Sequence, residues 1–147
     1  RYRELFTARD GEDLDEIAQR IGPDGVSAVD IVTDLARTWA LLRDGVNRTV
    51  TSETPVLHAG VVDPTERVWP ESRPEPVAVA VDLLADEADA FADQVARIPL
   101  ESWNLEASVA DSSGSTTVSA LDLLREAVRL GHDGLDQVAS TLAAVRR

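Results

Sequence analysis

Apolar residues recur at helical spacing in four stretches of the chain, and the longest lies near its end. Seven of them follow one another at alternating steps of three and four, with Gly131 filling the one gap: Leu121, Leu124, Val128, Leu135, Val138, Leu142 and Val145. This spacing places one apolar stripe along a helix of about seven turns. Because such a stripe has to be buried, we expect this helix to pack against others.

Three shorter patterns of the same kind precede it. Together they predict four helices, at about residues 2–20, 27–48, 76–97 and 117–145. Gly11 can divide the first helix into two pieces. Ser27, with Asp30 three residues later, predicts the start of the second helix as a capping box, and Thr116 or Thr117 is the expected cap of the fourth.

The helical pattern disappears between Thr49 and Pro76, where five prolines occur. Such a stretch can be a functional lid, a flexible connector or a long crossover between helices, and in a helical bundle the crossover is the commonest. Residues 100–116 are polar and small, with an expected turn at 111–115. The sequence therefore predicts one all-α domain over 1–147, a four-helix bundle with one long crossover loop.

Charge and composition narrow the function classes. The net charge of −13 argues against a nucleic-acid partner, which requires a basic footprint. The chain has no cysteine and no lysine, which excludes disulfides, thiolate metal sites and Schiff-base chemistry. No apolar run is long enough to span a membrane, and the charged first ten residues do not read as a signal peptide. We therefore expect a cytoplasmic protein with no membrane partner.

Few residues suggest chemistry. The sequence contains neither a Glu-x-x-His nor a His-x-x-x-His pair at His58 or His132, so it predicts no metal and no cofactor. Trp39 falls on the apolar stripe of the second helix and is expected in the core. Trp69, in the long connection, could cover one end of the bundle or line a pocket. Trp39, Trp69 and His132 are the pocket candidates.

Three segments carry a resemblance to a known family: Val26–Leu35, Ile98–Trp103 and Gly131–Val138. In their order and spacing they resemble the DinB/YfiT-like superfamily of DNA-damage-inducible four-helix bundles, in an actinobacterial-type member. The resemblance implies a divalent metal such as zinc or nickel, held by one histidine of the second helix and two of the fourth. Some members of that family are thiol-dependent transferases or isomerases.

The implied metal ligands are missing from this chain. The histidine of the second helix falls on Asp34, and the pair of the fourth falls on Leu130 and Gly134 or, one residue earlier, on Arg129 and Asp133. The first alignment places the pair in a second apolar strip beside the main one, formed by Ala120, Leu123, Ala127, Leu130 and Gly134. The second replaces a metal-centred cluster by charged groups, and a guanidinium does not bind metal. Both alignments predict a degenerate metal site.

Two functions follow as expectations. The first is a non-enzymatic module without metal, acting as a homodimer or as a small-ligand-binding protein. The alternative is a metal-dependent thiol transferase or isomerase, of the mycothiol type, that uses Asp34 and His132 as unusual ligands. The missing histidines favour the first.

Overall fold

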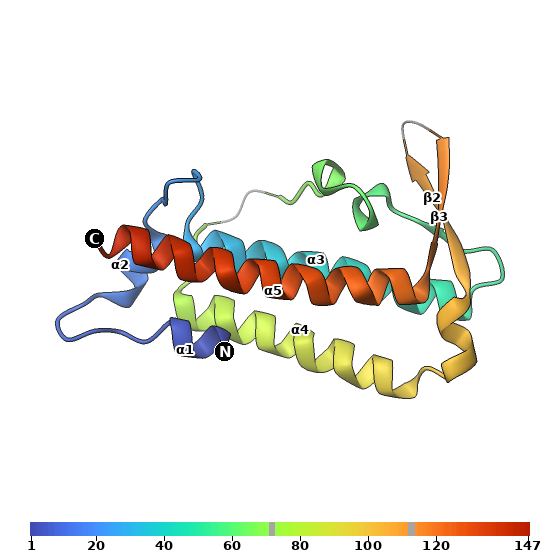
Figure 1. Ribbon diagram of the computed structural model, residues 1–147, viewed down its shortest axis with the longest axis horizontal. Coiled ribbons are helices and arrows are strands. Elements are labelled where there is room, and N and C mark those ends of the chain that lie inside the picture. The colour runs from blue at the N-terminus through green and yellow to red at the C-terminus, as the bar shows by residue number, and fades with distance from the viewer. Residues whose placement is uncertain (71–72, 112–113) are drawn as a thin grey trace. The chain divides into compact units, whose positions relative to one another are not determined.

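The structure is a computed structural model covering residues 1–147, and it describes residues 1–70, 73–111 and 114–147, without the side chains at 111, 114 and 115. Figure 1 shows the helices and strands in chain order. The described helices are α1 (Tyr2–Leu5), α2 (Leu14–Gln19), α3 (Ala28–Thr51), α4 (Val77–Arg97) and α5 (Ala120–Val145). The strands are β1 (Val56–Leu57), β2 (Glu106–Asp111) and β3 (Gly114–Ser119). Three short 3₁₀ turns complete them: η1 (Ala59–Val61), η2 (Pro64–Glu66) and η3 (Leu100–Asn104).

The prediction of an all-α four-helix bundle is wrong, because the chain combines helices with a three-stranded sheet in the order β1-β2-β3. β2 pairs with β3 in antiparallel register, with Ala107 opposite Val118, and with β1 in parallel register, with Leu57 opposite Val109. The buried side chains of β2 are Ala107 and Val109, which alternate with exposed polar or small residues. Such small residues give a weak strand signal. Residues 112–113 of the expected turn lie outside the described part of the chain.

The first predicted helix is divided into two, and the break that the sequence allows at Gly11 is confirmed. α1 and α2 are separated by residues 6–13, within which Gly11 takes a φ of +75° that favours glycine. Asp13 caps the start of α2, and its side chain accepts a hydrogen bond from the Glu16 amide at 3.2 Å.

Local capping sets the starts of α3 and α5. The predicted box at α3 is confirmed: the Asp30 amide donates to Ser27 Oγ at 3.1 Å, and the Ser27 amide donates to the Asp30 carboxylate at 3.1 Å. At α5 the same arrangement uses Ser119 and Asp122, with both bonds at 3.0 Å. The expected cap at Thr116 or Thr117 is wrong because both residues belong to β3.

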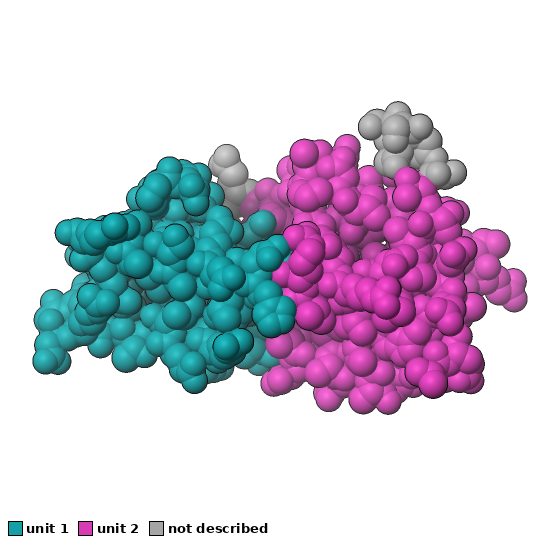
Figure 2. Space-filling view, in the orientation of Figure 1, with its two compact units in different colours: residues 1–36, 71–86, 130–147 teal, residues 37–70, 87–129 magenta. Residues whose placement is uncertain are grey.

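The chain divides into two compact units, coloured separately in Figure 2. Unit 1 comprises residues 1–36, 71–86 and 130–147, and unit 2 comprises residues 37–70 and 87–129. The helices α3, α4 and α5 each contribute residues to both units. The largest fully buried side chains of unit 2 are Leu42, Val46, Thr49, Val109 and Leu123, whereas those of unit 1 are Val32 and Val138.

The long connection after α3 is largely part of unit 2. Two short elements of this connection, β1 and η1, contain apolar residues, of which Leu57 and Val61 are buried. Both residues lie against α3 at Gly45, where a Cβ would stand 3.5 Å from Val61 and 3.6 Å from Leu57. Unit 2 is therefore built partly from a segment without helical periodicity. In the described residues, no helix has the length and the apolar character required to traverse a lipid bilayer.

The apolar stripe expected along α5 is buried only in part. In unit 1 its members Val138 and Leu142 are buried, as expected. In unit 2 the neighbouring strip is buried instead, through Ala120, Leu123 and Ala127. Val128, a member of the expected stripe, remains 54% exposed. The prediction is wrong for that half of the helix, and apolar surface is left uncovered there.

Candidate functional site

The uncovered surface of α5 forms one wall of an apolar groove in unit 2. The groove has a volume of about 400 Å³, within the range of small-molecule sites. α5 contributes Leu124, Ala127 and Val128, and α3 contributes Trp39. The side of the groove formed by α4 consists of Ala88, Phe91, Ala92, Val95 and Ala96. Every lining side chain is apolar apart from the indole N–H of Trp39.

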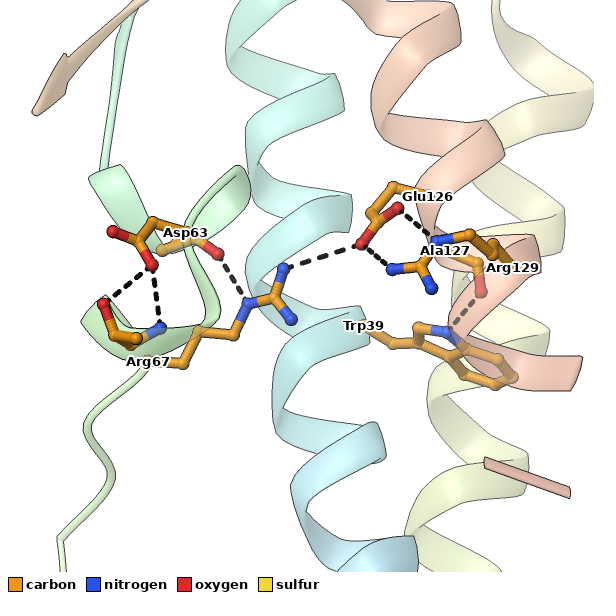
Figure 3. A network of polar contacts seen from close by, with 8 residues as sticks. Trp39, Asp63, Arg67, Glu126, Ala127 and Arg129 are labelled. Carbon is orange, nitrogen blue, oxygen red and sulfur yellow. Dashed lines mark hydrogen bonds and ion pairs between the residues drawn. The ribbon is translucent and has the colours of Figure 1, made fainter. Parts of the chain in front are cut away.

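That indole N–H already has a partner. Trp39 Nε1 donates to the carbonyl oxygen of Ala127 at 2.9 Å, a contact drawn in Figure 3. The bond links α3 to α5 within unit 2 and holds the ring in one orientation. It also leaves the groove without an unsatisfied polar group on this ring, so an apolar guest would displace no hydrogen bond from it.

The α4 side of the groove consists mostly of alanine, whose short side chains project little from the helix. Ala88, Ala92 and Ala96 are spaced four residues apart and therefore share one face of the helix. Phe91 is only 6% exposed and lies mostly within the core. Ala92 and Ala96 are exposed, so the surface that a guest would meet along α4 is aliphatic.

A polar network lies beside the groove on α5, at the residues that flank Ala127 and Val128. Arg129 forms a two-pronged ion pair with Glu126, at 2.9 Å from Nε and 2.6 Å from Nη2. Arg67, which follows η2, reaches the same carboxylate: its side chain is 8% exposed and its Nη2 lies 3.9 Å from Glu126 Oε1 (Figure 3). Arg67 Nε donates to the Gly60 carbonyl at 2.6 Å. The long connection thus contacts the turn of α5 that forms the groove wall.

The network changes the acidity of its carboxylate. The hydrogen bonds from Arg129 lower the pKa of Glu126, an effect that outweighs its partial burial, and the charges of Arg129 and Arg67 act in the same direction. Glu126 is therefore ionised at neutral pH, and the network is held by charge-assisted contacts.

The positions that the resemblance assigns to metal ligands in the first alignment all lie in unit 1. Asp34 is exposed on α3, Leu130 is half-buried and Gly134 is buried. A Cβ at Gly134 would stand 2.8 Å from Tyr2 Oη and 3.3 Å from Leu35 Cδ2. Tyr2 Oη donates to the Gly131 carbonyl at 2.6 Å. The phenol of Tyr2 therefore takes the space that a side chain at position 134 would need.

The second alignment involves both units. Asp34 and Asp133 are exposed residues of unit 1, whereas Arg129 belongs to unit 2 and pairs there with Glu126. His132, the other candidate ligand, is exposed in unit 1. Within the described parts of the chain, no group of three or more histidine, aspartate or glutamate side chains is placed to hold a metal ion.

Of the three pocket candidates, Trp39 is the one that lines the groove. Trp69 is half-buried in the connection of unit 2, and His132 lies in unit 1; neither belongs to the groove lining. The groove itself was missed by the sequence reasoning. The available signal was the second apolar strip of α5, because two adjacent strips cannot both face one core.

Unit 2 also has a larger, polar cleft of about 860 Å³ near the C-terminal ends of α3 and α4. Among its lining residues is Arg43, which pairs with Glu87 through Nε at 2.9 Å and Nη2 at 3.0 Å. The Arg43 carbonyl accepts a hydrogen bond from Gln94 at 3.1 Å. These groups satisfy one another, so they connect α3 to α4 within unit 2.

Comparison with known proteins adds no relative: a scan of protein-family models, a search of curated proteins and a search of solved structures each found no match. The resemblance to the DinB/YfiT-like superfamily stays a prediction.

Proposed function

We propose that this protein is a binding module that holds a small apolar molecule in the groove between α4 and α5 of unit 2. One observation carries the proposal: the groove is lined by apolar side chains, and its one polar group, the Trp39 N–H, is already bonded to Ala127. Tryptophan, phenylalanine, leucine, valine and alanine transfer no protons and form no covalent intermediates. The groove is therefore suited to binding rather than to catalysis.

The driving force would be the removal of apolar surface from water. Each methylene buried contributes about 0.8 kcal/mol, so a guest with several carbons can offset the entropy lost on association. Trp39 is held by its hydrogen bond, and the turn of α5 that carries Ala127 is held by the Glu126 network. A wall that is ordered before the guest arrives lowers the cost of binding.

The test is a titration of the isotopically labelled protein with neutral apolar compounds, n-hexanol and indole, followed by amide NMR. We expect shifts centred on Ala92, Leu124 and Val128. Ala92→Leu partly fills the groove and should weaken binding at least tenfold. Ala143→Leu is the matched control, an exposed alanine of α5 outside the groove, and should leave affinity unchanged.

Two results would count against the proposal. One is a titration in which neither compound shifts the groove amides. The other is a pair of variants, Ala92→Leu and Ala143→Leu, that change affinity equally. A second copy of the chain could cover the same surface, and a groove closed by self-association would appear as binding that improves on dilution.

A further inference from the structure

The 3₁₀ turn η1 begins after His58, and a ring nitrogen of this residue caps it. The Gly60 amide donates a hydrogen bond to His58 Nδ1 at 2.9 Å. An imidazole nitrogen accepts a hydrogen bond through its lone pair, so it accepts only while it carries no proton. The ring that caps η1 is therefore the neutral one, with its single proton on Nε2.

The neighbouring turn η2 has a cap of the same geometry but of different chemistry. Asp63 Oδ1 accepts from the Thr65 amide at 2.9 Å, again two residues further along the chain. A carboxyl group can accept a hydrogen bond whether or not it is protonated. Histidine, in contrast, is the side chain that changes its charge between about pH 5 and 8. Of these two caps, the one on η1 therefore depends on a proton in that range.

Gly60 is closely enclosed by the side chains around it. A Cβ at this residue would stand 3.0 Å from His58 Nδ1, 3.2 Å from Leu41 Cδ2 and 3.3 Å from Arg67 Cγ. A proton on His58 Nδ1 would direct one N–H at another across 2.9 Å, so the ring or the glycine would have to move. The Gly60 carbonyl accepts from Arg67 Nε at 2.6 Å. A movement of Gly60 would therefore also disturb the Arg67 side chain.

The charged groups around His58 do not replace the lost hydrogen bond. His58 lines a cavity of about 270 Å³ together with Asp44 and Arg48 of α3, which pair with each other at 2.8 Å. Arg67 Nη2 lies 3.9 Å from Glu126 Oε1. Each of these arginines thus has a carboxylate partner, so the surroundings of the ring are nearly neutral. The loss of the cap then decides what protonation does to η1.

We infer that His58 is a proton-operated cap: the neutral imidazole holds η1 in place, and protonation of Nδ1 releases it. The proton comes from solvent, to which His58 is exposed, and it produces an imidazolium with an N–H at both nitrogens. Stability from the cap is therefore full at the alkaline end of the histidine range and is lost as the pH falls. Leu57 and Val61 are buried, and we expect their packing to confine the change to Gly60 and the Arg67 side chain. This device is independent of what the groove binds.

The test follows two NMR signals of the full chain. At about pH 8 the nitrogen-15 shift of His58 Nδ1 should be that of a nitrogen without a proton. The protection factor of the Gly60 amide, which is corrected for the intrinsic pH dependence of exchange, should be about fivefold lower at pH ~5, the equivalent of ~1 kcal/mol for one hydrogen bond. The Thr65 amide should keep its protection factor, because a carboxyl oxygen caps its turn.

Three variants separate the proton from the packing. His58→Asn keeps an acceptor for the amide two residues later but takes up no proton in this range, so Gly60 should stay protected at both pH values. His58→Ala removes the acceptor, so Gly60 should be poorly protected at both. His132→Asn is the matched control, because it replaces the other of the two histidines, an exposed residue of unit 1, and should leave the response of Gly60 to pH unchanged. Circular dichroism checks that each sample stays folded.

Four results would overturn the inference. The first is a His58 ring that carries its proton on Nδ1 at the alkaline pH. The second is a wild-type Gly60 amide whose protection factor does not change with pH. The third is protection that falls as much in His58→Asn as in the wild type, and the fourth is a response to pH that disappears in His132→Asn.

Discussion

The contact between Tyr2 and Gly134 predicts whether Gly134→Ala raises or lowers the free energy of unfolding. Gly134 lies inside α5, where replacing glycine by alanine ordinarily stabilises a helix by about 1 kcal/mol. Here the new Cβ would stand 2.8 Å from Tyr2 Oη, closer than real Cβ contacts come. Relieving such overpacking costs roughly 1–3 kcal/mol. We therefore expect Gly134→Ala to lower the free energy of unfolding by up to about 2 kcal/mol.

Removing the Tyr2 hydroxyl should make Gly134→Ala stabilising instead of destabilising. In a Tyr2→Phe background the atom at 2.8 Å is absent, and the next contact is the Leu35 Cδ2 at 3.3 Å, the end of a flexible side chain. Tyr2→Phe alone should cost about 1 kcal/mol, because the hydrogen bond to Gly131 is lost. Gly134→Ala added to it should then stabilise the protein by a few tenths to about 1 kcal/mol.

The assay is a double-mutant cycle by urea denaturation, in which the free energies of unfolding of the four proteins are obtained with one shared m-value. The coupling energy between positions 2 and 134 should be about 1–3 kcal/mol. Gly134→Ala that stabilises both backgrounds by the same amount would refute the contact. In that case the phenol does not occupy the space that the DinB/YfiT-like resemblance assigns to a histidine.

Four further predictions concern other features. Burial, and to a lesser degree the charge of Asp136, raises the pKa of Tyr2 to about 12 from 10.0. The protonated phenol should therefore add stability that is full below about pH 10 and is lost as the pH rises through about 12. Ultraviolet absorbance follows the ionisation of this group alone, because the chain has one tyrosine. Ser119→Ala should cost about 1 kcal/mol by removing the α5 cap, measured by urea unfolding, and Ser119→Asp should recover most of it. Untagged protein should contain no stoichiometric zinc or nickel by elemental analysis, and metal that disappears with Asp34→Ala would support the thiol-transferase alternative instead. Sedimentation over a dilution series tests the expected homodimer, which a monomer at all concentrations would exclude.

Local chemistry explains which parts of the fold were predictable. The hydrogen bonds that cap α3 join Ser27 and Asp30, which are three residues apart, so the start of α3 could be inferred from sequence. β2 could not be inferred in this way, because its small residues give a weak pattern and its backbone pairs with two other segments, β1 and β3. Strands formed by small residues depend on their partners more than on their own composition.

The groove shows a second limit of periodicity. Two adjacent strips of α5 are apolar in sequence, and the spacing alone does not say which one the core covers. The structure buries Leu123 and leaves Val128 54% exposed, because the packing of the other residues of unit 2 determines which strip is covered. The contact between Arg67 and Glu126 joins residues far apart in sequence, so no local sequence pattern predicts it. Expectations at Asp34 and His132 came from the resemblance alone.

The way α4 begins has a consequence for the order of folding. α3 and α5 carry capping residues in their own sequences, whereas the first amide of α4, that of Val77, donates at 2.7 Å to Asp15, which lies 62 residues earlier. Closing so long a loop costs chain entropy that must be offset by packing in unit 1. The first turn of α4 should therefore form after the rate-limiting step, so that Asp15→Ala accelerates unfolding while refolding keeps nearly its original rate.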